Sequence, residues 1–364
     1  MKPTEFVKVN SQFWGEHLKE AAGHLPVSHR TELPGPMLFP RMMVLTETPD
    51  WNILELVGLS RTYRTLEVRR QKVGSVEEYF GLGDDTAAAP VVSLPGENLF
   101  KDATVATTEG KQALEERFPA AANVLGDEFI GAGEELLRFA PGNYATFDRT
   151  LLVHTAGDSL RAHWVFFALA IHRSEPADKY LGFLQTYSNA RPHLDPIGTM
   201  SLPLDADVLK ADAFESTYLA HGLQDSTVDE FLDKHESILL SAFGAAKLVR
   251  EPALGDDLQP DFILERADGS HIVGRLELPV VDTVNGKKRR RVFRTPVQDS
   301  AAELGKYAEY LKTADNRSQV KSKYDVDVED PRLLLIVPSQ ETVTPAAGVE
   351  IVDYDTILRL HLAS

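Results

Sequence analysis

The second half of the chain changes repeatedly between two periodicities, and the order of these changes limits the fold more than any other feature. Apolar residues at helical spacing follow a Ser226 or Thr227 N-cap, and two strand-like stretches then flank an Asp-Gly turn at 268–269. In order, the sequence predicts a helix over 226–243, a hairpin over 261–281, a helix over 295–314, a buried strand over 332–338, and a strand and helix over 348–360. This succession predicts an α/β fold with a mixed central sheet flanked by helices.

The first 220 residues give weaker signals. Residues 1–100 are punctuated by proline and glycine, and we expect them to be irregular and β-rich. The elements predicted after them are helices over 109–118, 131–140 and 177–190, and a hairpin of strands over 149–157 and 161–171. A chain of 364 residues suggests two domains, so we expect an N-terminal region of mixed α and β structure (α+β) over 1–220 and a C-terminal domain over 221–364.

Composition excludes several classes of function. The formal net charge is −17, which argues against binding nucleic acid by bulk charge, so any polyanion site must be local. The sequence contains no cysteine, which excludes disulfides, thiolate zinc sites and cysteine nucleophiles. The longest apolar run, at 164–171, is too short to cross a bilayer, and the first ten residues lack the apolar core of a signal peptide. We therefore expect a cytoplasmic protein with no membrane partner.

An acidic residue lies inside an otherwise apolar strand. The stretch "GRLELPVVD" at 274–282 carries Glu277 between two leucines, where an unpaired charge costs several kcal/mol. The hairpin also opens with an acid, Asp261, directly after Pro260. Two carboxylates from adjacent strands can chelate one or two Mg²⁺ ions, which would activate a water and hold a phosphodiester for in-line attack. The side-chain alternation of a strand places Arg275 on the same face as Glu277.

The ordered set of elements resembles a known family. The quoted stretches are "TVDEFLDKHESILL", "LQPDFILERADGSHIVGRLEL", "PVQDSAAELGKYAEYL", "RLLLIV" and "VEIVDYDTILRL", over roughly residues 222–364. In this order they resemble the C-terminal domain of Shedu antiphage-defence proteins, a member of the PD-(D/E)xK restriction-endonuclease-like superfamily. The resemblance implies a nuclease that uses Mg²⁺ or Mn²⁺ and acts on DNA. The expected substrate is phage DNA or double-stranded DNA. It also implies an N-terminal region that senses or regulates, and self-association into a dimer or tetramer.

The resemblance assigns roles to residues by position. Asp261 matches the first acidic residue of the motif, and Glu277 matches the second. Gln298 matches a polar residue that several members place beside the active site. An acid on the preceding helix often completes the metal site, and Glu230 or its neighbour Asp229 is the candidate here.

The sequence departs from the family pattern at one position. The motif lysine, expected two residues after Glu277, is replaced by Pro279, which can neither orient a water nor offset charge on a phosphate. Proline also removes a backbone donor, so the strand should end or bulge there. One alternative is that another residue supplies the cation, and the four candidates are Arg275, Lys287, Lys288 and Lys306. Otherwise the domain binds without cleaving, or the metals alone suffice at a reduced rate.

The run "KKRRRVFR" at 287–294 is the strongest local positive charge in this acidic chain. Most such runs are solvated loops, but this one follows the strand that carries Glu277, which favours contact with phosphates. The candidate DNA-binding residues are Lys287, Lys288, Arg289, Arg290, Arg291 and Arg294.

The remaining polar patterns favour structural roles. His154, His163 and His172 recur every nine residues, which suits satisfied core or surface histidines better than a metal set. Residues 353–355 are typical of a turn that caps a helix. For Asp261 and Glu277 the structural alternative is an ion pair, for instance with Arg275 or Arg266. Three functions thus remain open: a metal-dependent endonuclease, a nuclease-fold module that binds nucleic acid without cleavage, and a structural oligomer.

Overall fold

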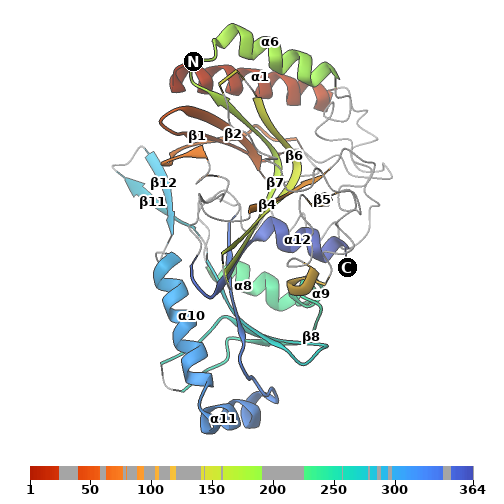
Figure 1. Cartoon of the computed structure of the whole chain (residues 1–364), viewed down its shortest axis with the longest axis vertical. Helices are drawn as coiled ribbons and strands as arrows, with labels where there is room; N and C mark the ends of the chain where they lie inside the picture. Colours follow the sequence, from red (N-terminus) through yellow and green to blue (C-terminus); the bar gives the residue numbers. More distant parts are fainter. Residues whose placement is uncertain are drawn as a thin grey trace.

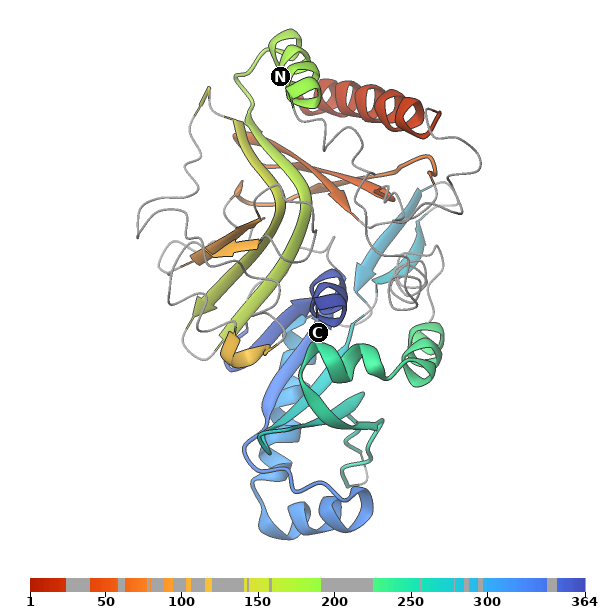
Figure 2. The same ribbon diagram turned by 90° about the vertical axis from the view of Figure 1, so that its right-hand side faces the viewer.

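The computed structural model contains one large, strongly curved sheet with helices on both faces (Figures 1 and 2). The structure describes residues 1–23, 40–57, 63–76, 79, 88–93, 103–105, 115–119, 141–142, 144–156, 159–190, 225–255, 257–277, 279–284, 288–293, 297–338 and 346–363. Within these ranges, no helix is long and apolar enough to span a bilayer.

The N-terminal half begins with a long helix, α1 (Pro3–Gly23), which the sequence did not predict. Three strands follow, β1 (Met42–Glu47), β2 (Trp51–Val57) and β3 (Glu67–Lys72), with β1 pairing antiparallel to β2 and parallel to β3. Helix α6 (Ala177–Ala190) lies beside α1 on the same side of these strands (Figures 1 and 2).

A long hairpin forms the middle of the molecule, as predicted. Its strands are β6 (Tyr144–Ala156) and β7 (Ser159–His172), and β6 continues outward to β4 (Ala88–Ser93) and β5 (Ala103–Val105). The other edge of β7 changes its partner along its length. Its residues 160–162 pair with β14, whereas residues 167–172 pair with β2.

The C-terminal half contains the predicted succession. Its elements are α8 (Asp225–Lys234), α9 (Ser237–Ala242), β8 (Ala245–Arg250), β9 (Phe262–Arg266), β10 (His271–Leu276), β11 (Pro279–Val284), β12 (Lys288–Phe293), α10 (Val297–Leu311), α11 (Ala314–Tyr324), β13 (Arg332–Val337), β14 (Val349–Asp353) and α12 (Tyr354–Ala363). The main sheet has the order β3-β1-β2-β7-β14-β13-β10-β9-β8, and β11 and β12 form a separate two-stranded sheet. One sheet therefore runs through both halves, across the boundary expected at residues 220 and 221.

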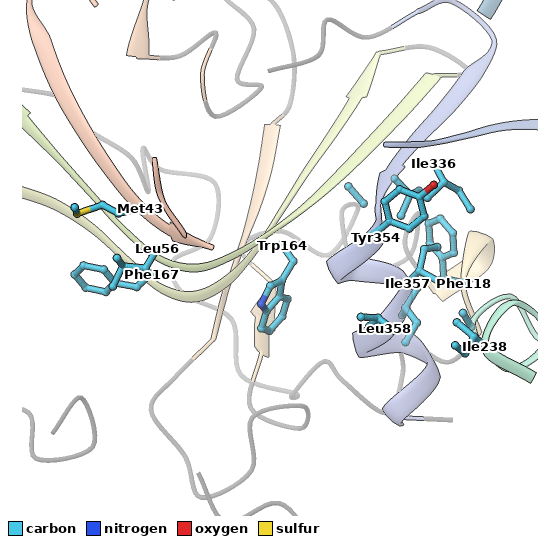
Figure 3. Close-up of a cluster of buried hydrophobic side chains, with 14 of the residues drawn as sticks. Met43, Leu56, Phe118, Trp164, Phe167, Ile238, Ile336, Tyr354, Ile357 and Leu358 are labelled. Carbon is cyan, nitrogen blue, oxygen red and sulfur yellow. The ribbon is translucent and has the colours of Figure 1, made fainter. Parts of the chain in front are cut away.

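Two apolar clusters cover the two faces of the C-terminal strands. One face packs on α10 and α11 through residues such as Ile263, Val273 and Leu304. The other packs on α9 and α12, and its cluster continues into the N-terminal half under α1. Figure 3 shows this continuity, with Trp164 placed between the side chains of the N-terminal strands and Tyr354 of α12.

The structure confirms the α/β fold with a mixed central sheet flanked by helices. It corrects the helix predicted over 226–243, which is two helices interrupted at His235 and Glu236. Residues 233–237 are polar, so the buried apolar face stops after Leu232 and resumes at Ile238. The predicted helix over 131–140 lies outside the described residues, as does most of the one over 109–118.

Candidate functional site

The two predicted carboxylates lie at the open end of the β9–β10 hairpin. Asp261 directly precedes β9 and Glu277 directly follows β10. Both backbones still pair with neighbouring strands, because the N–H of Asp261 donates to the Gly274 carbonyl at 3.1 Å and that of Glu277 to the Ile336 carbonyl at 2.8 Å. The hairpin register thus brings to one end of the sheet two acids that are sixteen positions apart in the chain.

Asp261 is held by the strand opposite it. Its Oδ2 accepts a hydrogen bond of 2.6 Å from the backbone N–H of Leu276, the residue before Glu277. Burial raises the pKa of Asp261 to about 6, although this hydrogen bond and the nearby charge of Arg275 lower it. The carboxylate is therefore ionised at neutral pH but is less well stabilised than one in water.

Glu277 is the buried charge that the sequence predicted, with an exposed fraction of 4%. Its Oε1 accepts a hydrogen bond from the hydroxyl of Ser300 on α10, and it lies 4.0 Å from Nη2 of Arg275. Burial raises the pKa of Glu277, and the Ser300 hydroxyl and Arg275 oppose that shift. The ion pair confirms that Arg275 and Glu277 share one face of the strand.

Tyr354, the first residue of α12, is buried near these acids. Burial raises its pKa well above the ordinary value, and the charges of Asp261, Asp229 and Glu277 raise it further. All three carboxylates therefore lie close enough to Tyr354 to act on its hydroxyl, which stays protonated. Figure 3 shows the hydroxyl of Tyr354 directed towards the side of the strand that carries Ile336.

The acid that α8 brings towards the site is Asp229, and Glu230 is exposed on the surface of the helix. Asp229 accepts a hydrogen bond of 2.8 Å from Arg250, which also binds Asp233 and the main-chain carbonyl of Asp261. Burial lowers the pKa of Arg250, but the hydrogen bonds that it donates to Asp233 and Asp229 outweigh this effect, and the net direction is upward. The structure favours Asp229 over Glu230 as the third acid.

Among the residues that the structure describes, Arg275 is the proposed cation that an ion pair places beside Glu277. It is shared with Glu303 of α10, with which it forms a second ion pair. Lys306 and Gln298 are exposed on α10, and among the described residues no contact joins either of them to Glu277. As expected, the strand ends before Pro279, which instead begins β11.

The basic run is a strand, which corrects the expected loop. Residues Lys288–Phe293 form β12 and pair with β11, so that Asp282 lies opposite Arg290 and Val281 opposite Arg291. The β11–β12 ribbon extends from the C-terminal half towards the N-terminal strands (Figures 1 and 2). Lys287 and Arg294 lie outside the described residues, as does Leu278.

Asp261 and Glu277 are the two candidate ligands for a divalent cation at this end of the hairpin. The hydrogen bond from Leu276 uses one oxygen of Asp261 and that from Ser300 uses one oxygen of Glu277, so each carboxylate has a second oxygen. Mg²⁺ is commonly bound through one or two carboxylates with water and phosphate completing its coordination. Within the described ranges, however, no group of three or more His, Asp or Glu side chains is gathered closely enough to hold a metal by itself.

A second buried polar cluster lies where β7 changes partner. His163 contacts Asp353 through Nδ1 at 2.8 Å and Glu55 through Nε2 at 3.4 Å. Burial lowers the pKa of His163, but Glu55 and Asp353 raise it by more, to about 9. Tyr79 donates a hydrogen bond to Glu55, and Arg161 is buried beside both carboxylates. His163 is thus a satisfied core histidine, as predicted.

Asp353 joins this cluster to α12. Its Oδ2 accepts a hydrogen bond from the N–H of Trp164 at 2.8 Å, and its Oδ1 accepts one from the N–H of Thr356 at 2.6 Å. The second bond is a helix N-cap, which confirms the predicted capping turn. The next residue is Tyr354, which lies near the carboxylate site. Adjacent residues at the start of α12 therefore belong to the histidine cluster and to the carboxylate site.

Sequence reasoning missed Ser300, Glu303 and Tyr354. Ser300 and Glu303 lie three residues apart on α10, on the side that faces β10, and this spacing was a usable signal. The sequence predicts a capping turn at residues 353–355, and this prediction does not place Tyr354 near the acids. No sequence pattern indicates that Tyr354 lies near Asp261, because this proximity depends on how β14 places α12 beside β13 and β10.

Comparison with protein-family models, with curated proteins and with solved structures gave no match. The family resemblance therefore depends on the order of elements and on the placement of Asp261 and Glu277.

Proposed function

We propose that the C-terminal half is a metal-dependent DNA endonuclease of the Shedu antiphage type. The observation that carries the proposal is the placement of Asp261 and Glu277 at the same end of one hairpin, with the helix that follows packed against Glu277. The expected succession of elements around this hairpin adds support. An oligomeric, cytoplasmic enzyme that acts on phage DNA is the finer form of this proposal.

In this proposal, Asp261 and Glu277 hold Mg²⁺ or Mn²⁺ through the oxygens that their hydrogen bonds leave. The bound cation would supply an activated water and stabilise charge on the phosphate. The hydroxyl of Ser300 and the N–H of Leu276 orient the two carboxylates. Arg275 places a fixed positive charge beside Glu277, in the role that the motif lysine has elsewhere in offsetting phosphate charge. It cannot take a proton, because arginine stays protonated in proteins.

A second function is favoured by one specific observation. Glu277 is nearly sealed from solvent, and Arg275 is shared with Glu303, so the site resembles a completed internal network. A domain of this kind would bind nucleic acid through the β12 strand without cutting it. That alternative predicts DNA binding that weakens as salt is added and that does not require a divalent metal.

The test is cleavage of supercoiled and linear DNA by the full chain with Mg²⁺, with Mn²⁺ and with chelator. Asp261→Asn and Glu277→Gln should each lower the rate at least 100-fold while leaving the fold intact by circular dichroism. Asp268→Asn is the matched control, because Asp268 is an exposed acid at the turn of the same hairpin. Cleavage that survives in both site variants would refute the assignment, and metal-independent binding with no cleavage would establish the binding module.

A further inference from the structure

Asp353 is the residue at which strands from both halves of the chain meet helix α12. It is buried at the end of β14. Its Oδ2 lies 2.8 Å from Nδ1 of His163 on β7 and accepts the N–H of Trp164 at 2.8 Å. Its Oδ1 accepts the N–H of Thr356 in α12 at 2.6 Å. The two oxygens of one carboxylate therefore join β7 to α12.

The backbone of Asp353 lies one strand away from the hairpin site. Parallel pairing sets Asp353 beside Val337 in β13. On its other edge, β13 pairs with β10, so that Ile336 lies beside Leu276. The carbonyl of Ile336 also accepts the N–H of Glu277 at 2.8 Å. A shift of Asp353 would thus move the end of β13 and, with it, the carbonyl that holds the backbone of Glu277.

The start of α12 gives a second path from Asp353 to the acids. Tyr354 follows Asp353 directly, is buried, and lies near Asp261 and Glu277, whose charges act on its hydroxyl. Figure 3 shows Tyr354 at the start of α12 beside Ile336 of β13. The cap that Asp353 provides fixes the first turn of α12, and so it fixes the place of Tyr354.

The cation that faces Asp353 comes from the N-terminal half. His163 contacts Asp353 through one ring nitrogen, and it contacts Glu55 of β2 through the other at 3.4 Å. Glu55 in turn accepts a hydrogen bond from Tyr79. Residues 160–162 of β7 also pair with β14. The charge of Asp353 is therefore balanced by the N-terminal half, while its backbone is part of the C-terminal strands.

We propose that Asp353 is a positioning residue through which the N-terminal half holds the carboxylate end of the hairpin. In this role it acts through β13 and α12, which fix where Glu277 lies relative to Asp261, and not by contact with metal or DNA. Its effect on cleavage rests on the proposed nuclease, whereas its effect on the hairpin backbone does not. An asparagine has one acceptor oxygen, so Asp353→Asn cannot replace both carboxylate oxygens.

The first test is hydrogen exchange of the full chain, read by mass spectrometry, which needs neither metal nor DNA. Asp353→Asn should speed exchange in residues 271–277 about tenfold more than in α1, because the end of β13 is loosened locally. Equal acceleration in residues 271–277 and in α1 would report a global loss of stability alone, and it would overturn the proposal.

His361→Gln is the matched control for this measurement. His361 is a second buried histidine of the same helix, and its Nδ1 lies 2.6 Å from the hydroxyl of Ser241 on α9. The substitution therefore loosens α12 at its other end. It should not speed exchange in residues 271–277 relative to α1, and an effect equal to that of Asp353→Asn would contradict the assignment.

DNA cleavage is the second readout, taken at a temperature where circular dichroism shows each variant folded. Asp353→Asn should lower kcat about tenfold, because a small displacement of Glu277 is costly to catalysis. KM for DNA should change less than about twofold, since β12 pairs with β11 and not with β13. His361→Gln should change neither constant.

The two readouts separate this proposal from the nuclease on which it rests. If the parent protein cuts DNA and Asp353→Asn cuts equally well, the positioning role is wrong and the nuclease stands. If the parent protein does not cut, the nuclease fails and hydrogen exchange alone decides the positioning role. Where Asp353→Asn does not fold, His163→Gln takes its place. Glutamine keeps a donor for Asp353 but no charge, so the same effects should be smaller, about threefold.

Discussion

The molecule contains two regions of buried acids, and their charges are balanced differently. In the histidine cluster, Glu55 and Asp353 face two cations, His163 and Arg161. At the hairpin end, five described carboxylates face two guanidinium groups, and three of them, Asp229, Asp233 and Glu303, are partly exposed. The carboxylates are Asp229, Asp233, Asp261, Glu277 and Glu303, and the guanidinium groups belong to Arg250 and Arg275.

The two regions differ in how far the protein itself compensates the charge of its acids. The histidine cluster is neutral when His163 is protonated, and each of its carboxylates is hydrogen-bonded. At the hairpin end, burial raises the pKa of both Asp261 and Glu277, so their charges are not fully compensated by the protein. Uncompensated buried acids are typical of functional sites, where an external cation completes the balance.

The largest effect is expected from breaking the balanced cluster. Asp353→Asn removes the charge that faces His163 and weakens the cap of α12, so it should lower the free energy of unfolding by about 3–5 kcal/mol. Urea denaturation measures this loss. A double-mutant cycle with His163→Gln should recover part of it, because the two residues interact directly. A loss below about 1 kcal/mol would mean that the cluster does not hold the fold.

The next effect is a dependence of stability on pH. The folded pKa of His163, about 9, is above the unfolded value of 6.5. The protonated histidine therefore stabilises the fold fully below pH 6.5, and this contribution is lost as pH rises towards 9. It amounts to about 3 kcal/mol. Urea midpoints measured between pH 6 and pH 9 should fall for the parent protein and change less for His163→Gln; parallel curves would contradict the assignment.

The smallest effect is a gain at the unbalanced site. The raised pKa of Asp261 means that its charge opposes folding above pH 6, so Asp261→Asn should raise the free energy of unfolding by about 1–2 kcal/mol at pH 8. The backbone N–H of Leu276 keeps an acceptor in this variant. Asp268→Asn, at the exposed turn, should change stability by less than about 0.5 kcal/mol. A loss of stability in Asp261→Asn would place Asp261 with the structural acids.

Much of the C-terminal half could be predicted, because its signals are local. The Asp-Gly turn fixes the hairpin register, and the register alone brings Asp261 and Glu277 to one end. Proline at 279 ends β10 because it lacks a donor for the ladder. Residues 288–291 are all basic, so they lack the alternation of apolar and polar residues by which a strand is predicted.

The N-terminal half was harder to predict because polar residues interrupt its apolar patterns. Helix α1 has a buried stripe at every fourth residue, namely Phe6, Asn10, Trp14 and Leu18. Asn10 is polar, so it interrupts the apolar pattern that would predict a helix. That asparagine is buried and bonded to Tyr180 of α6 at 2.7 Å, a partner 170 residues away. The histidine cluster likewise joins residues from three distant segments, and a single sequence holds no local sign of such contacts.

The position of β14 has a consequence for any attempt to study the C-terminal half alone. This strand is hydrogen-bonded to β13 on one side and to residues 160–162 of β7 on the other. A fragment that begins at residue 221 would leave β14 as a bare apolar edge, open to pairing with another chain. The N-terminal half therefore also covers the edge of the strand that leads into α12, and separating the halves would expose that edge and favour aggregation.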